Sequence, residues 1–225
     1  MEITYYGHSC LRIETEGKNL LVDPFLTGNP KAAEIDPNSI SADYIILTHA
    51  HFDHISDAEQ IAKRSGALII CNHEMAMHYQ SKGFECHEMN FGGSKEFDFG
   101  KLKMVYSTHS SSFPDNSYGG NPAGFVLSSG GKTIYLAGDT ALTMDMKLIP
   151  MFFKLDLAVL PIGGNFTMDI DEAVVAAEFV ECDKILGIHY DTMPIIEIDH
   201  ETAKKKFTEK GKELILLNSG ESIEV

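Results

Sequence analysis

The sequence predicts a mixed α/β protein built from two similar halves. Short β-branched runs alternate with amphipathic segments, which is typical of strands and helices packed in layers. A weak internal repeat runs through this pattern at an offset of about 114 residues, the sign of a duplicated unit. A chain of 225 residues buries about 70% or more of its unfolded surface. We therefore expect one domain spanning residues 1–225.

The strand candidates are short apolar runs rich in Val, Ile, Leu and Tyr, bounded by Gly, Pro, Asp or Asn. They are residues 3–6, 11–14, 19–22, 44–47, 68–71, 102–106, 124–127, 133–136, 157–160, 185–188 and 214–217. Most lie directly before a polar residue, so several polar side chains are expected at strand ends.

The helix candidates are fewer. The clearest begins at Ser56, because Ser56-Asp57-Ala58-Glu59 matches a capping box and Gly66 follows the last turn. Three others are expected at residues 74–81, 171–181 and 200–209. Thr167 and Asp169 precede the third of these four helices and are interpreted as caps.

The repeat pairs segments of the two halves. Residues 17–23 (GKNLLVD) resemble residues 131–139 (GKTIYLAGD), and residues 43–47 resemble residues 156–160. In this scheme His8 pairs with His109. The second half carries an extra loop at residues 111–121, which is interpreted either as a cover for a site or as a surface excursion.

Composition excludes some classes of protein. The formal net charge is −15 and basic clusters are absent, which argues against nucleic acid and favours a small-molecule substrate. No apolar run reaches the ~20 residues of a membrane span, and no secretory signal precedes the first strand. The four cysteines form no Cys-x-x-Cys pair and are interpreted as reduced core residues. We expect a cytoplasmic protein that does not bind membranes, with its oligomeric state, including a homo-oligomer, left open.

The segment that follows residues 44–47 is rich in metal-binding side chains. It reads His49-Ala50-His51-Phe52-Asp53-His54, so three histidines and an aspartate occur within six residues. Imidazole and carboxylate are ligands used by zinc, iron and manganese sites. Because two cations need further ligands, we add His109, Asp139 and His189, which each follow a predicted strand.

This set of residues, in chain order, resembles the complete ligand set of the metallo-β-lactamase superfamily. The resemblance implies a four-layer αββα sandwich with the metals at one edge between the sheets. It also implies that His49, His51 and His109 bind one cation, that Asp53, His54 and His189 bind the other, and that Asp139 bridges them. The motifs at residues 6–9, 21–24 and 161–168 are similar to those of small metal-dependent hydrolases related to ascorbate-phosphate lactonases.

A binuclear site predicts the chemistry. Two divalent cations about 3.5–4 Å apart can activate a shared water for attack on a carbonyl or phosphoryl centre. Asp53 is the predicted catalytic residue, because it can orient that water and take its proton. His8 and Asp23 are expected near the site, either behind the ligands or in contact with substrate. Zinc is the expected metal, with manganese, iron or nickel as alternatives.

The expected activity is hydrolysis of an ester, lactone or phosphodiester of a small molecule. A nuclease of the same fold is one alternative, although its relatives use added arms that grip the polymer. A binuclear iron redox protein is another, although such relatives typically have Glu in place of the second histidine, His51, and carry a flavin domain. A binding protein without activity would be expected to have lost ligands.

Overall fold

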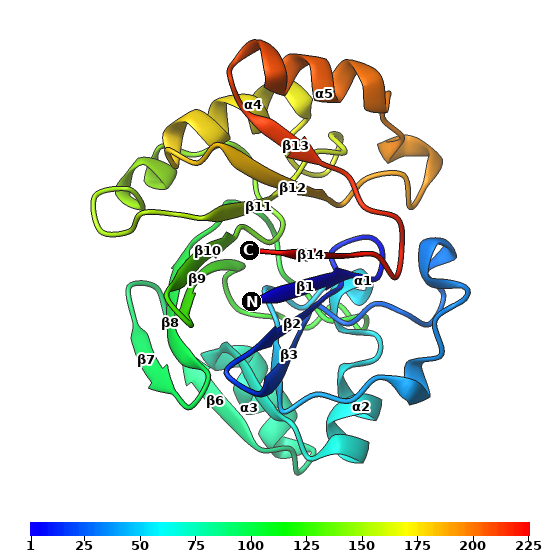
Figure 1. The fold of residues 1–225 in the computed structure, drawn as a ribbon. Helices are drawn as coiled ribbons and strands as arrows, with labels where there is room; N and C mark the ends of the chain where they lie inside the picture. The colour runs from blue at the N-terminus through cyan, green and yellow to red at the C-terminus, as the bar shows by residue number, and fades with distance from the viewer.

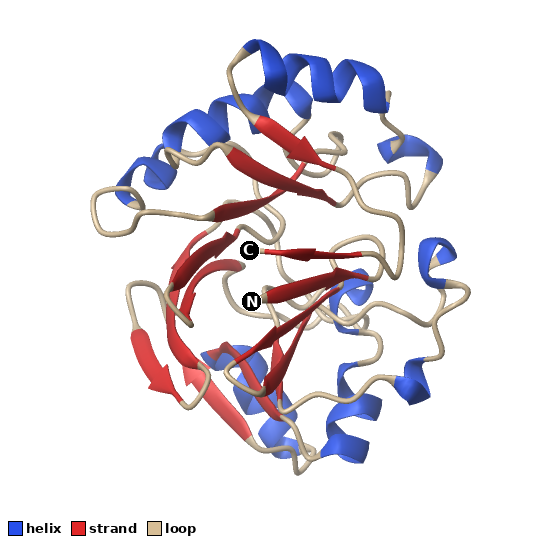
Figure 2. Ribbon diagram, in the orientation of Figure 1, coloured by secondary structure: helices blue, strands red, loops and turns tan.

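The computed structural model describes all of residues 1–225 and consists of two stacked β-sheets with helices on both outer faces (Figures 1 and 2). Each sheet has seven strands. This arrangement is the four-layer αββα sandwich that the sequence predicts.

The first sheet holds the strands of the first half together with the last strand of the chain. Its order is β14 (Ser222–Glu224), β1 (Glu2–Tyr5), β2 (Leu11–Thr15), β3 (Lys18–Val22), β4 (Tyr44–Ile46), β5 (Leu68–Asn72) and β6 (Cys86–Met89). Neighbours from β14 to β3 are antiparallel, and neighbours from β3 to β6 are parallel.

The second sheet has the same construction. Its order is β7 (Ser94–Phe97), β8 (Gly100–Tyr106), β9 (Ala123–Ser129), β10 (Lys132–Leu136), β11 (Leu157–Pro161), β12 (Lys184–Ile188) and β13 (Glu213–Ile215). Three antiparallel pairs are again followed by three parallel pairs. The predicted duplication is therefore confirmed, with β1 and β8 in equivalent places. Because β14 completes the first sheet, the two chain ends lie side by side (Figure 1).

The helices cover the outer faces of the sheets (Figure 2). They are α1 (Phe52–Ile55), α2 (Ala58–Ser65), α3 (His73–Ser81), α4 (Ile170–Phe179) and α5 (His200–Glu209), with short 3-10 turns η1 (Pro30–Ala32), η2 (Pro37–Ser39), η3 (Met144–Leu148) and η4 (Pro194–Ile196). Helix α3 contacts β5 and β6, whereas α4 contacts β11 and α5 contacts β13. None of the helices has the length and apolar character needed to span a bilayer.

Three hydrophobic clusters hold the four layers together. One lies between the sheets and includes Ile13 and Phe125, another packs the second sheet against α4 and α5 around Phe207, and the third packs the first sheet against α2 and α3 around Tyr79. All four side chains are almost completely buried. Truncating such a core aromatic to Ala costs about 3–5 kcal/mol.

The strands that sequence patterns miss are β6, β7 and β14. All three lie at a sheet edge, and their side chains are mostly exposed or half-buried. Edge strands face water and carry polar residues that discourage pairing with other chains, so the apolar signal of a strand is absent.

The capping box expected at Ser56 is wrong. Helix α2 begins at Ala58 with Asp57 as its N-cap, and no side chain caps it. Instead, the Asp57 carboxylate accepts hydrogen bonds from the backbone N–H of Leu26 at 2.8 Å and of Thr27 at 2.9 Å. Tertiary contacts with the loop after β3 thus replace the local cap. The predicted stop at Gly66 is confirmed by its left-handed φ of 70°.

Candidate metal centre

The candidate site lies at one edge of the sandwich, where strands of both sheets end. The polar residues that follow these strands are His8 after β1, Asp23 after β3, His49 after β4, His109 after β8, Asp139 after β10 and His189 after β12. The one-turn helix α1 and its N-cap add His51, Asp53 and His54. All nine sequence-predicted site residues therefore lie at this edge.

Several of these residues have unusual backbone conformations. His8, Asp23 and His189 have φ values of 57°, 43° and 56°, in the left-handed region. Such a conformation costs a non-glycine residue about 1–3 kcal/mol and is concentrated at functional sites. Gly138, at φ 62°, precedes Asp139, and a Cβ there would lie 2.9 Å from the Thr48 side chain. These turns end the strands abruptly.

The carboxylate of Asp139 is the centre of the cluster. Its Oδ2 lies 3.0 Å from His189 Nε2, 3.3 Å from His54 Nε2, 3.6 Å from His109 Nε2 and 4.0 Å from His49 Nε2. One oxygen atom is thus surrounded by four imidazole nitrogens. This geometry is suited to a carboxylate that two cations share.

The remaining donor atoms form two groups on either side of Asp139. His49, His51 and His109 form one group, whose ligand atoms lie within 4.8 Å of one another. The second group holds Asp53, His54 and His189, and His8 joins it within the same limit. The division of ligands implied by the family resemblance is reproduced in this geometry, while metal binding by each residue stays a prediction.

The donor set fits divalent cations. His54 Nε2, Asp139 Oδ1 and His189 Nδ1 are buried and have no hydrogen-bond partner. Leaving one buried polar atom unpaired costs about 1–3 kcal/mol, so atoms of this kind usually have a partner such as water or an ion. Of these atoms, His54 Nε2 faces Asp139 Oδ2 at 3.3 Å, and imidazole and carboxylate groups are ligands of zinc, iron and manganese.

A layer of hydrogen bonds orients the histidines from behind. Asp23 Oδ2 lies 2.9 Å from His54 Nδ1 and accepts a hydrogen bond of 2.6 Å from the Thr48 hydroxyl. The same hydroxyl oxygen lies 3.0 Å from His49 Nδ1. Asp23 therefore holds two rings with their Nε2 atoms toward Asp139, the arrangement typical of metal ligands. The expected position of Asp23 behind the ligands agrees with these contacts.

Burial controls the charge of most of the rings. It lowers the pKa of His49 well below the ordinary value and lowers the pKa of His8 to about 4. It also lowers the pKa of His51 and of His109. These rings are therefore neutral near pH 7, the form in which imidazole binds a metal.

The charges of His54, Asp53 and Asp139 depend on one another. Burial lowers the pKa of His54, but the carboxylates of Asp139 and Asp23 outweigh burial and raise it well above the ordinary value. Burial raises the pKa of Asp53 and Asp139, yet the neighbouring histidines hold both pKa values below the ordinary range. Both carboxylates are thus ionised, as a cation site requires, and a cation bound by His54 would displace the proton that the carboxylates of Asp139 and Asp23 hold on its ring.

The loop at residues 111–121 is fixed against the cluster. The Ser111 hydroxyl accepts from the Ala50 backbone N–H at 3.1 Å and donates to Gly119 O at 3.0 Å. The Asn72 side chain also donates to Gly119 O at 2.8 Å. A Cβ on Gly119 would collide with Ala50, so only glycine allows this close approach. This loop supports the turn between His49 and His51.

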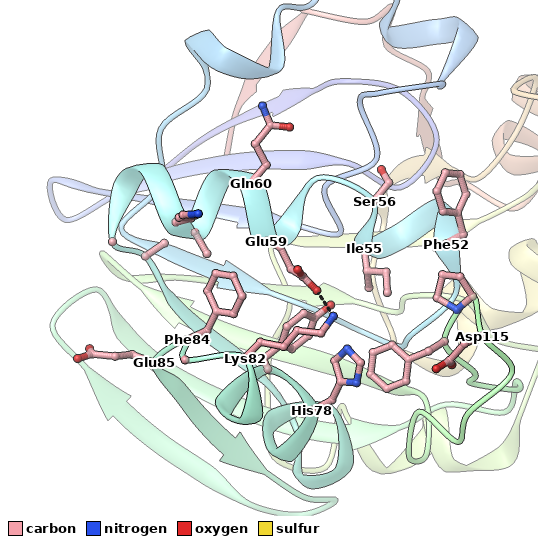
Figure 3. A pocket seen from close by; sticks show the side chains of 18 residues that line it. Phe52, Ile55, Ser56, Glu59, Gln60, His78, Lys82, Phe84, Glu85 and Asp115 are labelled. Carbon is pink, nitrogen blue, oxygen red and sulfur yellow. Dashed lines mark hydrogen bonds and ion pairs between the residues drawn. The ribbon is translucent and has the colours of Figure 1, made fainter.

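A separate groove of about 1390 Å³ lies on the other side of α1, between α2 and α3 (Figure 3). Phe52 and Ile55 line it, whereas Asp53 and His54 of the same turn face the cluster. Lys82 pairs with Glu59 across it at 2.5 Å. No histidine or aspartate of the cluster lines this groove.

Thr192 is a site residue that sequence reasoning missed. Its hydroxyl lies 2.9 Å from His8 Nδ1, in a loop that follows His189. A single threonine three residues after a histidine carries no motif, so only the tertiary structure identifies its contact with His8. His73 follows β5 as His189 follows β12, and these strands hold equivalent places in the two sheets, but His73 is exposed and pairs with Glu88 at 2.7 Å.

The fold and the cluster together define the class of protein. A family model described as the beta-lactamase superfamily domain matches residues 2–189. The chain therefore belongs to the beta-lactamase superfamily, among its metal-dependent hydrolases.

Its curated relatives narrow this class. The chain is 61% identical over 225 residues to the UPF0173 metal-dependent hydrolase of Flavobacterium johnsoniae, covering 100% of both chains. It is 62% identical over 226 residues to the UPF0173 metal-dependent hydrolase of Christiangramia forsetii, again covering 100% of both. A solved structure, the metallo hydrolase Igni18 of Ignicoccus hospitalis, is similar with a TM-score of 0.89 and 33% identity, over 99% of this chain and 97% of that chain.

Proposed function

We propose that this enzyme hydrolyses an ester, lactone or phosphodiester bond of a small molecule with the help of two divalent cations. The observation that carries the proposal is the pair of ligand groups on either side of Asp139 Oδ2. His49, His51 and His109 would hold one cation, Asp53, His54 and His189 would hold the other, and Asp139 would contact both. Bound there, the cations would lower the pKa of a water molecule and stabilise the charge that develops on the substrate.

Asp53 is the proposed proton acceptor. Its side chain is 29% exposed, whereas the side chains of Asp139 and Asp23 are 2% and 1% exposed. Because neighbouring histidines hold its pKa low, Asp53 is ionised at neutral pH and can accept a hydrogen bond from an attacking water. An exposed carboxylate can also pass the proton on to solvent, which a buried one cannot.

The charges around the cluster favour an ester or lactone over a phosphodiester. The chain has two arginines, and both lie elsewhere: Arg12 pairs with Glu14, and Arg64 donates to Pro37 O. The carboxylates of the cluster pair with histidines alone. Sites for phosphoryl groups commonly use Arg to bind the oxygens in a bidentate manner. We expect the phosphodiesterase activity to be the weaker one.

Zinc is the proposed metal, because histidine nitrogens outnumber carboxylates in both groups; manganese, iron and nickel are the alternatives.

A cytoplasmic location belongs to the same proposal, since all four cysteines are free. The net charge of −15 supports a small molecule rather than nucleic acid as the substrate.

The test combines elemental analysis with paired assays. Wild type and Asp139→Ala are compared for metal content, and for hydrolysis of p-nitrophenyl acetate, a γ-lactone and bis-p-nitrophenyl phosphate. We expect about two metals per wild-type chain, fewer in Asp139→Ala, and at least ~100-fold slower ester hydrolysis in the variant. Asp183→Ala, an exposed residue paired with Lys212, is the matched control. Wild type that cannot be loaded with metal would overturn the proposal.

A further inference from the structure

The imidazole of His8 is buried in the cluster and has a contact on each ring nitrogen, as the proposed ligand His54 does. Its side chain is completely buried, its Nδ1 lies 2.9 Å from Thr192 Oγ1, and its Nε2 lies 3.0 Å from Asp53 Oδ2. That Nε2 and the donor atoms of Asp53, His54 and His189 all lie within 4.8 Å of one another. Donor atoms that bind one zinc at about 2.0–2.1 Å lie about 3–4 Å apart, so these four atoms are close enough to share one cation together with Asp139.

The hydrogen bonds around Thr192 are compatible with a proton on Nδ1 of His8, the form that a metal-binding ring needs. The Thr192 hydroxyl donates to the carbonyl oxygen of Tyr190 at 3.3 Å, so its lone pairs are left to accept from His8 Nδ1–H. The Nε2 atom of a neutral ring then carries a lone pair, and it points at Asp53. Without a cation Nε2 can instead carry the proton and donate to Asp53 Oδ2 at 3.0 Å, and a cation bound by both atoms would take the place of that proton.

His49 has the same arrangement. Its Nδ1 lies 3.0 Å from the Thr48 hydroxyl, and that hydroxyl donates its hydrogen to Asp23. In both rings a threonine oxygen can therefore accept from Nδ1–H, which leaves Nε2 free as a ligand. A second hydrogen bond of this kind on the far ring nitrogen is the usual mark of a metal-binding histidine.

We propose that His8 is a ligand of the cation held by Asp53, His54 and His189. The proposal rests on the proposed function only for the presence of that cation. The duplication supports it independently, because His8 follows β1 as His109 follows β8, and these strands hold equivalent places in the two sheets. Each half of the chain then supplies one histidine from this position, His109 to one cation and His8 to the other.

Cadmium-113 NMR tests the assignment directly. In wild type loaded with ¹¹³Cd, proton–cadmium correlation detects only ring protons of histidines bonded to the metal. We expect the His8 ring to couple to the same cadmium resonance as His54 and His189. This measurement needs no variant, so a folding defect cannot obscure it. Correlations from His54 and His189 without one from His8 would overturn this inference and leave the proposed function intact, whereas failure of wild type to bind cadmium would overturn both.

Zinc affinity gives a second readout. Competition with a chromophoric chelator is measured for wild type, for His8→Gln and for the control His200→Gln, whose exposed ring pairs with Asp191 at 2.7 Å outside the cluster. Glutamine at position 8 can still donate to Asp53 but is a poor zinc ligand. We expect His8→Gln to lose at least ~100-fold in affinity for one of two zinc ions, with the other unchanged. Affinities in His8→Gln equal to those of His200→Gln would contradict the assignment.

Discussion

Asp23 illustrates how a single buried carboxylate organises the site. It accepts hydrogen bonds from the Thr48 backbone N–H at 2.8 Å and from the Thr48 hydroxyl at 2.6 Å, and it contacts the His54 ring. The sequence indicates its position through the repeat, in which Asp23 corresponds to Asp139. Asp23 faces the back of the rings, however, while Asp139 faces their Nε2 atoms, and the three-dimensional arrangement favours the place behind the ligands over contact with substrate for Asp23.

Replacing Asp23 by Asn tests its role in orientation. The amide NH₂ group would face donors where the carboxylate now accepts, so His54 would lose its fixed orientation. We expect Asp23→Asn to weaken zinc binding by about 10–100-fold, measured by competition with a chelator. Asp183→Asn, which is exposed, is the control. Unchanged zinc affinity in Asp23→Asn would show that the ring needs no such partner.

The cysteines yield a prediction about thiol reactivity. Cys10, Cys71 and Cys182 are buried, and burial raises the pKa of the half-buried Cys86 thiol to about 11. Raising a thiol pKa reduces its reactive thiolate, so at pH 8 roughly one Cys86 in a thousand is ionised, against about one in four for an exposed thiol. We expect native protein to react with iodoacetamide at least ~100-fold more slowly than unfolded protein, as mass spectrometry of the alkylated protein would measure. Rapid labelling of Cys86 in the native state would contradict this.

At the scale of elements, the N-termini of α4 and α2 are stabilised by different contacts. Helix α4 has a true capping box: the Glu172 backbone N–H donates to Asp169 Oδ1 at 2.9 Å, and the Asp169 backbone N–H donates to Glu172 Oε2 at 3.4 Å. The expectation that Asp169 is a cap is confirmed, whereas Thr167 is not the N-cap. At Ser56 the same sequence pattern forms no cap, because the Ser56 hydroxyl donates to Asp57 Oδ2 at 2.8 Å and the Asp57 carboxylate is used by the loop after β3.

The cap of α4 contributes to stability. Asp169→Ala removes the acceptor for the Glu172 backbone N–H, and N-cap truncations of this kind cost about 0.5–2 kcal/mol. We expect a decrease of about 1 kcal/mol in the free energy of unfolding, measured by urea denaturation. Thr167→Ala is the matched control and is expected to change it by less than about 0.5 kcal/mol. Equal effects of the two changes would mean that the box does not act as a cap.

At the scale of the whole molecule, the site joins the two halves. Strands of both sheets end at the cluster, and His189 N donates to His8 O at 2.8 Å between them. Cations bound there would link ligands from the first half with Asp139, His109 and His189 from the second. Metal binding at this place would therefore be coupled to the packing of the halves on each other.

Metal removal is expected to destabilise the fold. A cation that binds only the folded chain, at about 100 times its Kd, stabilises it by about 2.7 kcal/mol. For a chain of this size that corresponds to a Tm shift of about 5–10 °C. We expect dipicolinate to lower the Tm of metal-loaded wild type by this amount in calorimetry, and to have little effect on Asp139→Ala. An identical Tm with and without chelator would argue against a metal that joins the halves.

Much of the fold could be predicted because its signals are local. The strands buried in the core carry continuous apolar runs, and the sequence indicates each of them to within a residue or two. The edge strands β6, β7 and β14 are missed because their side chains are mostly exposed or half-buried, so these strands lack an apolar run. Pairing of β14 with β1 joins residues at opposite ends of the chain, and no local pattern reports such a contact.

The sequence by itself determined the mixed α/β class, the duplication and the candidate ligands, because metal-binding side chains at strand ends form a local pattern. Its resemblance to the metallo-β-lactamase superfamily added the four-layer arrangement and the expected places of His8 and Asp23. Only the tertiary structure decided how these side chains face one another. It places Asp139 Oδ2 among four rings, turns Asp23 behind them, and brings Thr192 to within 2.9 Å of His8. Those relations depend on left-handed turns at strand ends and on contacts between distant segments, which are set by the packing of two sheets and not by neighbours in the chain.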